Sequence, residues 1–226
     1  MKYIFVDFEM NPVAKEFKEQ KKICRGEIIE IGAVLLGETY EEEARFKQLV
    51  KPKYNKKIYK KYTSLTGITT EMVKDAPEFS EALDIFADWS EKLSGGCYEI
   101  YAWSENDLAQ LKSEMRLKQI PTTERLQYMV DHWIDFQKIF TQLLNLEKPM
   151  SLSTAVELTA NLFEGKQHDA LWDAKNTANI FALSRNEALF KEQMKVVLDA
   201  LKPERPHTFS MGDMFSPEML SKMGMK

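Results

Sequence analysis

The chain has 226 residues, of which 44% are hydrophobic and 29% charged, and these values are typical of a folded globular protein. Two cysteines and three histidines are too few for a disulfide framework or a four-ligand zinc site, and no apolar run reaches the roughly 18 residues of a membrane span. The net charge of −4 does not by itself indicate a polyanionic partner. Because Asp7 and Glu9 interrupt the apolar start that a signal peptide needs, we expect a protein of the reducing cytoplasm.

The first third of the chain predicts three strands. Residues 3–10 are apolar and aromatic up to two acids, as in a buried strand whose end reaches the surface. Residues 27–36 and 45–50 flank an acidic turn and predict a hairpin, so the three strands would follow one another as a meander. Residues 64–73 predict a turn that feeds a helix, with Gly67 as the conformationally permissive residue.

The remainder of the chain alternates predicted strands with helices. Short apolar runs predict strands at 97–103 and 126–134. Apolar residues at helical spacing and capping residues predict helices over 78–93, 105–119, 151–163 and 170–184, and one more that begins at Asp135. Gly95 and Gly96 end the first of these helices, and Ser104 begins the second.

This order predicts an α/β fold with a mixed five-stranded sheet, flanked by helices on both faces. The length favours one large domain, which we expect to span residues 1–200. From about Lys202 the chain is rich in proline, methionine and polar residues, so we expect residues 201–226 to form a loosely packed tail.

Positive charge is concentrated in one segment, residues 51–62. It contains six lysines and three tyrosines but no acid, so the rest of the chain carries a net charge of about −10. Such a segment could follow a phosphate backbone and stack bases, or it could be a solvated linker.

Two acids occupy a segment that otherwise predicts a core strand. Asp7 and Glu9 lie two residues apart, so their side chains leave the same face of a strand, about 6.5–7 Å apart. Like charges at this separation raise each other's pKa unless a cation lies between them, and hard divalent cations prefer carboxylate oxygens. The alternative is that the strand ends at Asp7 and that both acids are solvated.

Three further residues follow strand ends or begin helices. Asp107 comes three residues after Ser104, which fits a helix capping box but also the edge of a sheet where α/β folds bind ligands. His168 and Asp173 are five residues apart, which is about 140° apart on one regular helix. They can face one site if the helix begins near Asp169, with His168 in the preceding loop.

Together these motifs resemble the DEDDh branch of the exonuclease superfamily, which has the ribonuclease H-like fold. The resemblance covers about residues 1–185 and rests on DFE at 7–9, on Asp107 in YAWSENDLAQL and on HDALWD at 168–173. SLTGIT at 64–69 matches a substrate-contacting turn of this branch. DFEM and LTGIT are most similar to the Eri-like group, which includes histone-mRNA 3′-exonuclease relatives and bacterial inhibitors of the KinA sporulation pathway.

The resemblance implies a two-metal active site. The implied metal ligands of two Mg²⁺ or Mn²⁺ ions are Asp7, Glu9, Asp107 and Asp173, with Asp7 bridging both ions. The charges agree, because two dications balance four carboxylates. His168 would be the general base that takes a proton from the attacking water, a role that suits an imidazole near neutral pH. The products would be nucleoside 5′-monophosphates released from a 3′ end.

The resemblance also implies contacts to the substrate. Met10, Leu65 and Thr66 match positions that bind the terminal nucleotide, and the partners would be 3′ ends of single-stranded RNA or DNA, with RNA favoured. Two alternatives stay open. One is a non-catalytic module that keeps this fold to bind nucleic acid or protein, and the other is a nuclease that acts on dinucleotides or short oligonucleotides.

Overall fold

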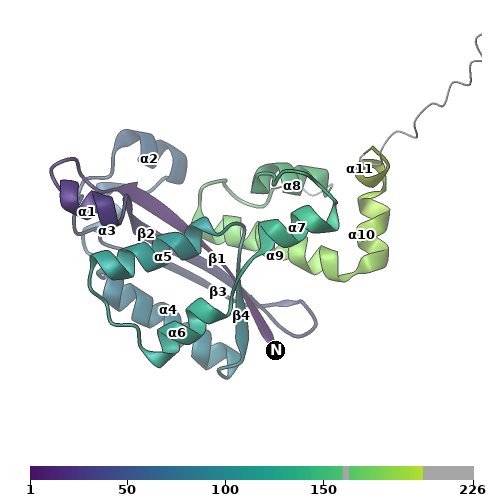
Figure 1. Ribbon diagram of the computed structural model, residues 1–226, viewed down its shortest axis with the longest axis horizontal. Coiled ribbons are helices and arrows are strands. Elements are labelled where there is room, and N and C mark those ends of the chain that lie inside the picture. The colour runs from purple at the N-terminus through teal and green to yellow at the C-terminus, as the bar shows by residue number, and fades with distance from the viewer. Residues whose placement is uncertain (160–162, 201–226) are drawn as a thin grey trace, which may run out of the picture.

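The computed structural model describes residues 1–159 and 163–200, and its centre is one five-stranded sheet. The strands are β1 (Lys2–Pro12), β2 (Gly26–Leu36), β3 (Glu42–Leu49), β4 (Tyr98–Ala102) and β5 (Trp133–Asp135), in the order β3-β2-β1-β4-β5 (Figure 1). β1 to β3 are antiparallel, whereas β4 is parallel to β1 and β5 is parallel to β4. The predicted mixed sheet with a leading meander is therefore confirmed.

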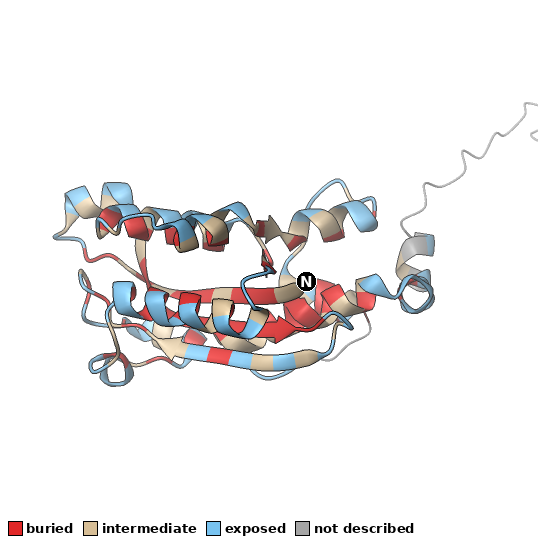
Figure 2. Ribbon diagram, turned by 90° about the horizontal axis from the view of Figure 1, so that it is seen from below, coloured by how far each residue is buried: buried red, intermediate tan, exposed pale blue. Residues whose placement is uncertain are grey.

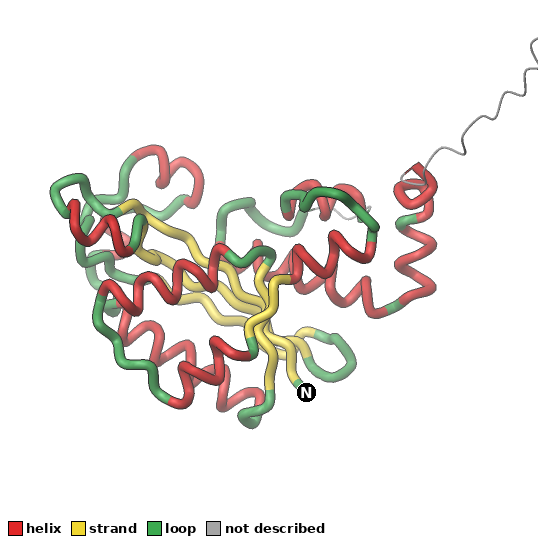
Figure 3. Tube along the Cα trace, viewed as in Figure 1, coloured by secondary structure: helices red, strands yellow, loops and turns green. Residues whose placement is uncertain are grey.

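Helices lie on both sides of this sheet, as Figure 3 shows. They are α1 (Lys18–Ile23), α2 (Lys60–Thr66), α3 (Thr70–Val73), α4 (Phe79–Ser94), α5 (Asn106–Leu117), α6 (Glu124–Asp131), α7 (Phe136–Leu143), α8 (Leu152–Leu158), α9 (Ala170–Arg185), α10 (Glu187–Gln193) and α11 (Lys195–Ala200). Within the described residues, no helix has both the length and the apolar character that crossing a membrane requires.

The alternation of side chains along β1 divides the core into two layers. Ile4, Val6 and Phe8 pack on one face of the sheet against residues of α4, α5 and α6. Phe5 points to the opposite face and packs against α7 and α9, where its ring lies 5.0 Å from that of Phe181. Figure 2 shows the result, because β1, β2 and β4 are largely buried, whereas the edge strand β3 is mostly exposed or half-buried and the helices expose their outer sides.

The prediction of a strand over 126–134 is wrong for most of its length. Residues 124–131 form α6, because the hydroxyl of Thr123 accepts a hydrogen bond from Leu126 N and caps the helix. Leu126 and Met129, three residues apart, then bury the same side of this helix. The fifth strand is only Trp133–Asp135, and Asp135 caps α7 as predicted.

Other element boundaries shift by a few residues. Glu105 is the N-cap of α5 in place of Ser104, and the lysine-rich segment ends in α2, which was not predicted. Gly67 has φ of +84°, which confirms its permissive role after α2. The end of the predicted helix 151–163 at 160–162 and the predicted tail at 201–226 lie outside the described residues.

Candidate active site

Two of the predicted acids lie in the middle of the sheet. β1 continues to Pro12, so the alternative in which the strand ends at Asp7 is wrong. Asp7 pairs with Gly32 of β2, and Glu9 pairs with Glu30, before the register shifts between Glu9 and Met10. The side chains of Asp7 and Glu9 therefore point to the same face of the sheet as Phe5, the face that α9 covers. Irregularities of this kind bend a strand and are frequent beside active sites.

Helix α9 brings Asp173 to the same face. A Cβ atom at Gly32 would lie 2.1 Å from backbone atoms of Ala170 and Leu171, so only glycine allows the helix to begin this close to β2. The helix begins at Ala170 with Asp169 as its N-cap, which is the start that convergence of His168 and Asp173 requires. Asp173 then lies in the first turn, over the sheet.

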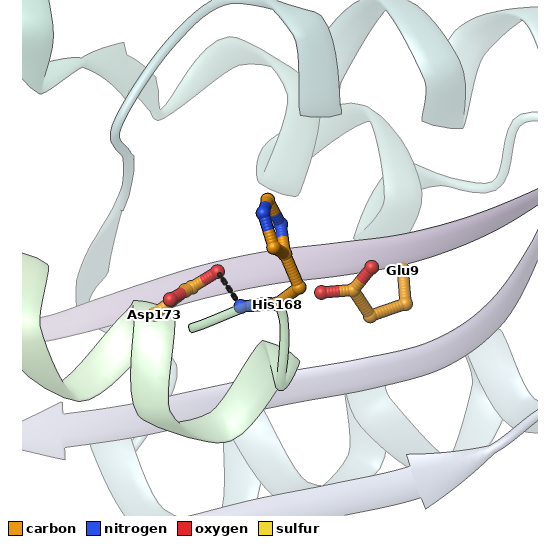
Figure 4. Close-up of side chains that lie close together, drawn as sticks. All are labelled: Glu9, His168 and Asp173. Carbon is orange, nitrogen blue, oxygen red and sulfur yellow. Dashed lines mark hydrogen bonds between the residues drawn. The ribbon is translucent and has the colours of Figure 1, made fainter. Parts of the chain in front are cut away.

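The loop before α9 turns His168 toward these acids. His168 has φ of +62°, and its backbone N–H donates a hydrogen bond of 3.2 Å to Oδ2 of Asp173. Possible ligand atoms of Glu9, His168 and Asp173 all lie within 4.8 Å of one another. Figure 4 shows the three side chains converging from β1, the loop and α9.

Asp107 comes to the site from a different helix, α5. It lies in the first turn of α5, directly after β4, which is the parallel neighbour of β1. Its buried Oδ1 atom accepts a hydrogen bond of 3.2 Å from Phe8 N, between the other two strand acids. Asp107 is thus fixed to β1 by this hydrogen bond.

Burial and mutual repulsion disfavour the charged forms of these carboxyl groups. Burial is the main cause that raises the pKa of Asp7 well above its usual range, and repulsion from Asp107, Asp173 and Glu9 adds to it. The same two causes raise the pKa of Glu9 to about 8 and those of Asp107 and Asp173 to about 7. A cluster of oxygen donors that repel one another in this way fits divalent cations.

Two charged residues that the sequence did not indicate, Glu30 and Lys47, lie next to this cluster. Glu30 is buried opposite Glu9, and burial raises its pKa as well. Lys47 of β3 lies 3.5 Å from Glu30 and 2.6 Å from Asp169. Glu30 interrupts an apolar strand just as Asp7 does, so the same argument could have found it.

Two of the predicted substrate contacts, Thr66 and Met10, line different cavities. Thr66 is buried, and its hydroxyl donates to the carbonyl of Tyr62, whereas Leu65 is 40% exposed. Thr66 and Gly67 line a cavity of about 820 Å³ that extends to the charged residues beside the site. Met10 is half-buried and lines a second cavity of about 370 Å³ between α1 and α5.

The lysine-rich segment is held firmly against the sheet. The buried carboxylate of Glu27 accepts hydrogen bonds of 2.7 to 3.0 Å from three successive backbone N–H groups of residues 53–55. Tyr54 packs against Phe17 with ring centroids 5.3 Å apart. Five of the six lysines are exposed, namely Lys53, Lys56, Lys57, Lys60 and Lys61. The segment is thus an ordered, positively charged loop that runs into the first turn of α2.

Comparisons with known proteins agree with this geometry. ERI1 exoribonuclease 2 of Danio rerio is 30% identical over 194 residues, which cover 77% of this chain and 33% of that protein. The 3′-5′ exoribonuclease 1 of Homo sapiens is 28% identical over 204 residues, which cover 80% of this chain and 56% of that protein. The chain thus spans about a third to about half of the length of these relatives.

A solved structure and a family model complete the assignment. The nuclease domain of 3′hExo, described as a DEDDh family member bound to rAMP, superposes with a TM-score of 0.70 and 26% identity. The superposition covers 83% of this chain and 93% of that domain, and it confirms the predicted ribonuclease H-like fold. The model of the exonuclease family RNase_T matches residues 4–181. The chain therefore belongs to the exonuclease family, as the DEDDh-like motifs predicted.

Proposed function

We propose that the protein is a metal-dependent 3′-to-5′ exonuclease that releases nucleoside 5′-monophosphates from single-stranded nucleic acid, with RNA favoured. The observation that carries this proposal is the convergence of acids from β1, α5 and α9 beside a loop histidine. Asp7 and Asp107 are 100 positions apart in the chain, and Asp107 and Asp173 are 66 positions apart. A binding module has no chemical need for this combination of groups.

Asp7, Glu9, Asp107 and Asp173 would hold the metal ions of this site. All four offer carboxylate oxygens, which Mg²⁺ and Mn²⁺ both accept. Their raised pKa values support the assignment, because the charged cluster is stable only with positive charge nearby. When bound, two dications supply charge stabilisation for the attacking and leaving oxygens of a phosphoryl displacement.

His168 would act as the general base. Its side chain is exposed on the loop, while its backbone is tied to Asp173, so the imidazole can reach a water molecule beside the acids. Imidazole is the side chain most often used as a general base near neutral pH. The proton of the attacking water would pass to the imidazole and then to solvent.

The remaining assignments concern the substrate. Met10, Leu65 and Thr66 would contact the terminal nucleotide, and the lysines of residues 51–62 would bind phosphates further along the strand. The exposed lysines and the exposed side chain of Leu65 support these roles. RNA is favoured because the similar proteins are described as exoribonucleases and 3′hExo was solved with rAMP.

Single-stranded RNA and DNA oligonucleotides of 2 to about 30 nucleotides, labelled at the 3′ end, test the proposal in Mg²⁺, in Mn²⁺ and in EDTA. We expect the labelled nucleotide to appear as a 5′-monophosphate only when metal is present. Binding without release of label would favour the non-catalytic module. Cleavage confined to the shortest substrates would assign the protein to the oligonucleotide nucleases.

A further inference from the structure

The start of α9 is fixed by residues of the sheet. Asp169 is the N-cap, but its side chain makes no capping hydrogen bond. Instead Glu30 of β2 accepts a hydrogen bond of 3.3 Å from Ala170 N, and Oδ2 of Asp169 accepts one of 2.6 Å from Nζ of Lys47. Within the part of the chain that the structure describes, Oδ1 of Asp169 is buried without a hydrogen-bond partner. The hydrogen bond from Lys47 therefore holds this carboxylate in place.

Lys47 connects three segments at one point. It pairs with Gly32 in the β2–β3 register, and Gly32 is the residue against which the helix begins. The lysine ammonium also lies 3.5 Å from Oε1 of the buried Glu30. A single positive charge on β3 thus joins β2 to the residue that follows His168.

This connection matters because His168 has an unfavourable backbone conformation. A positive φ in a residue other than glycine costs free energy and persists only where the surroundings hold it. On one side, the N–H of His168 is held by Asp173. On the other side, the next residue, Asp169, is held by Lys47. Both ends of the turn are therefore anchored.

We propose that Lys47 is a positioning residue, which sets the His168 loop through Asp169 and neutralises Glu30 beside the acidic site. This inference rests on the proposed function, since it assigns Lys47 a role in turnover. Removing the ammonium group deprives Asp169 and Glu30 of their positive partner. Both carboxylates then lie unpaired beside the four acids of the candidate site. The loop then loses its second anchor, and the imidazole moves away from the position that proton transfer needs.

Lys175 of α9 offers a matched control for Lys47. It also joins α9 to β3 by an ion pair, because its Nζ lies 2.6 Å from Oε2 of Glu42. Lys175 lies six residues after Asp169, which is about 9 Å along the axis of α9. The side chain of Lys175 is 14% exposed, whereas that of Lys47 is 40% exposed. A purely structural role therefore predicts that losing Lys175 is at least as harmful as losing Lys47.

The test compares Lys47→Met, Lys47→Arg and Lys175→Met in steady-state cleavage of a single-stranded RNA. We expect Lys47→Met to lower kcat by about 10- to 100-fold with KM nearly unchanged, because misplacing a catalytic group by about 1 Å has effects of this size. Lys47→Arg should restore most of the rate, and Lys175→Met should stay near wild type. Equal losses in Lys47→Met and Lys175→Met, or no rescue by arginine, would overturn the proposal.

Amide hydrogen exchange gives a second readout that needs no catalysis. Peptides that span residues 164–172 should exchange faster in Lys47→Met and in Asp169→Asn, but not in Lys175→Met. Unchanged exchange in the first two variants would refute the anchoring role even if activity falls. If the wild-type protein cleaves nothing, the proposed function fails, whereas the exchange result still decides whether Lys47 holds the loop.

Discussion

The backbone N–H of His168 donates a hydrogen bond to the side chain of Asp173, one helical turn beyond the start of α9. The two residues therefore depend on each other, because the acid that faces the candidate metal site also holds the loop of the candidate base. Oδ2 of Asp173 accepts this bond, which would leave Oδ1 available to a metal ion. Substitutions at position 173 can separate the two roles.

Replacing Asp173 by asparagine should remove the metal ligand but keep an acceptor for the His168 N–H. Replacing it by alanine should remove both. We expect both variants to lose cleavage, but only Asp173→Ala to expose residues 166–169 to faster amide exchange. Exchange mass spectrometry on the two variants checks this. Identical exchange in the two would show that the hydrogen bond does not hold the loop.

His168→Ala should lower kcat by about 10²- to 10⁴-fold, the range in which a general base contributes. Affinity for Mn²⁺, measured by isothermal titration calorimetry, should change little, because the four carboxylates remain. His132 provides a matched control, since its ring stacks on Tyr128 at the end of α6. His132→Ala should keep its activity. Wild-type rates for His168→Ala from pH 6 to 9 would remove histidine from the mechanism.

The raised pKa values of the acids predict how pH changes the stability of the metal-free protein. In the folded state, Glu9 has a pKa of about 8, and Asp107 and Asp173 have pKa values of about 7. In the unfolded chain, these groups titrate near pH 4. The folded state therefore binds more protons than the unfolded chain from about pH 4 to 8, and the free energy of unfolding falls as pH rises through this window.

Thermal unfolding in EDTA at pH 5, 6, 7 and 8 measures this decline. Mg²⁺ or Mn²⁺ should restore stability most strongly at pH 8, where the carboxyl groups are already deprotonated. Glu9→Gln should flatten the pH dependence and reduce the effect of metal, whereas Glu81→Gln on the exposed side of α4 should change neither. A melting temperature that rises from pH 5 to 8 in EDTA would contradict the arrangement of the acids.

Neutralising the exposed lysines of the loop should weaken nucleic-acid binding in a salt-dependent way. For single strands, each phosphate contact contributes about 0.7 to the slope of log K against log salt. Changing Lys56, Lys57, Lys60 and Lys61 to glutamine should therefore lower the slope by up to about 3. The control with the same charge change uses four exposed lysines elsewhere, Lys92, Lys112, Lys148 and Lys195. Equal slopes for both variants would mark the loop as an uninvolved surface.

Much of the candidate site could be predicted because charged residues interrupt apolar strands. Asp7 and Glu9 stand out for this reason, and Asp169 as N-cap explains how His168 and Asp173 converge. Glu30 carries the same signal, because it interrupts the apolar strand β2. The pairing of Lys47 with Asp169 could not be predicted, since it joins residues 122 positions apart in the chain. Such contacts depend on strand register, which local patterns leave open.

The error at residues 126–134 has a different physical cause. LQYMVDHWI is rich in apolar and aromatic residues, as strands are, but Thr123 caps a helix there. Leu126 and Met129 then face the core on one side of that helix. A cap three residues outside the apolar run decided between strand and helix, and local composition alone gave the wrong answer.

Release of the 3′-terminal nucleotide by wild type and by Asp7→Asn is the most direct measurement of the central claim. Single-stranded RNA with a 3′-terminal label is incubated with each protein in Mn²⁺ and in EDTA, and the products are identified by chromatography. We expect a labelled nucleoside 5′-monophosphate from wild type in Mn²⁺ alone, and none from the folded Asp7→Asn variant. Release in EDTA, or undiminished release by Asp7→Asn, would contradict a metal-dependent site built on these acids.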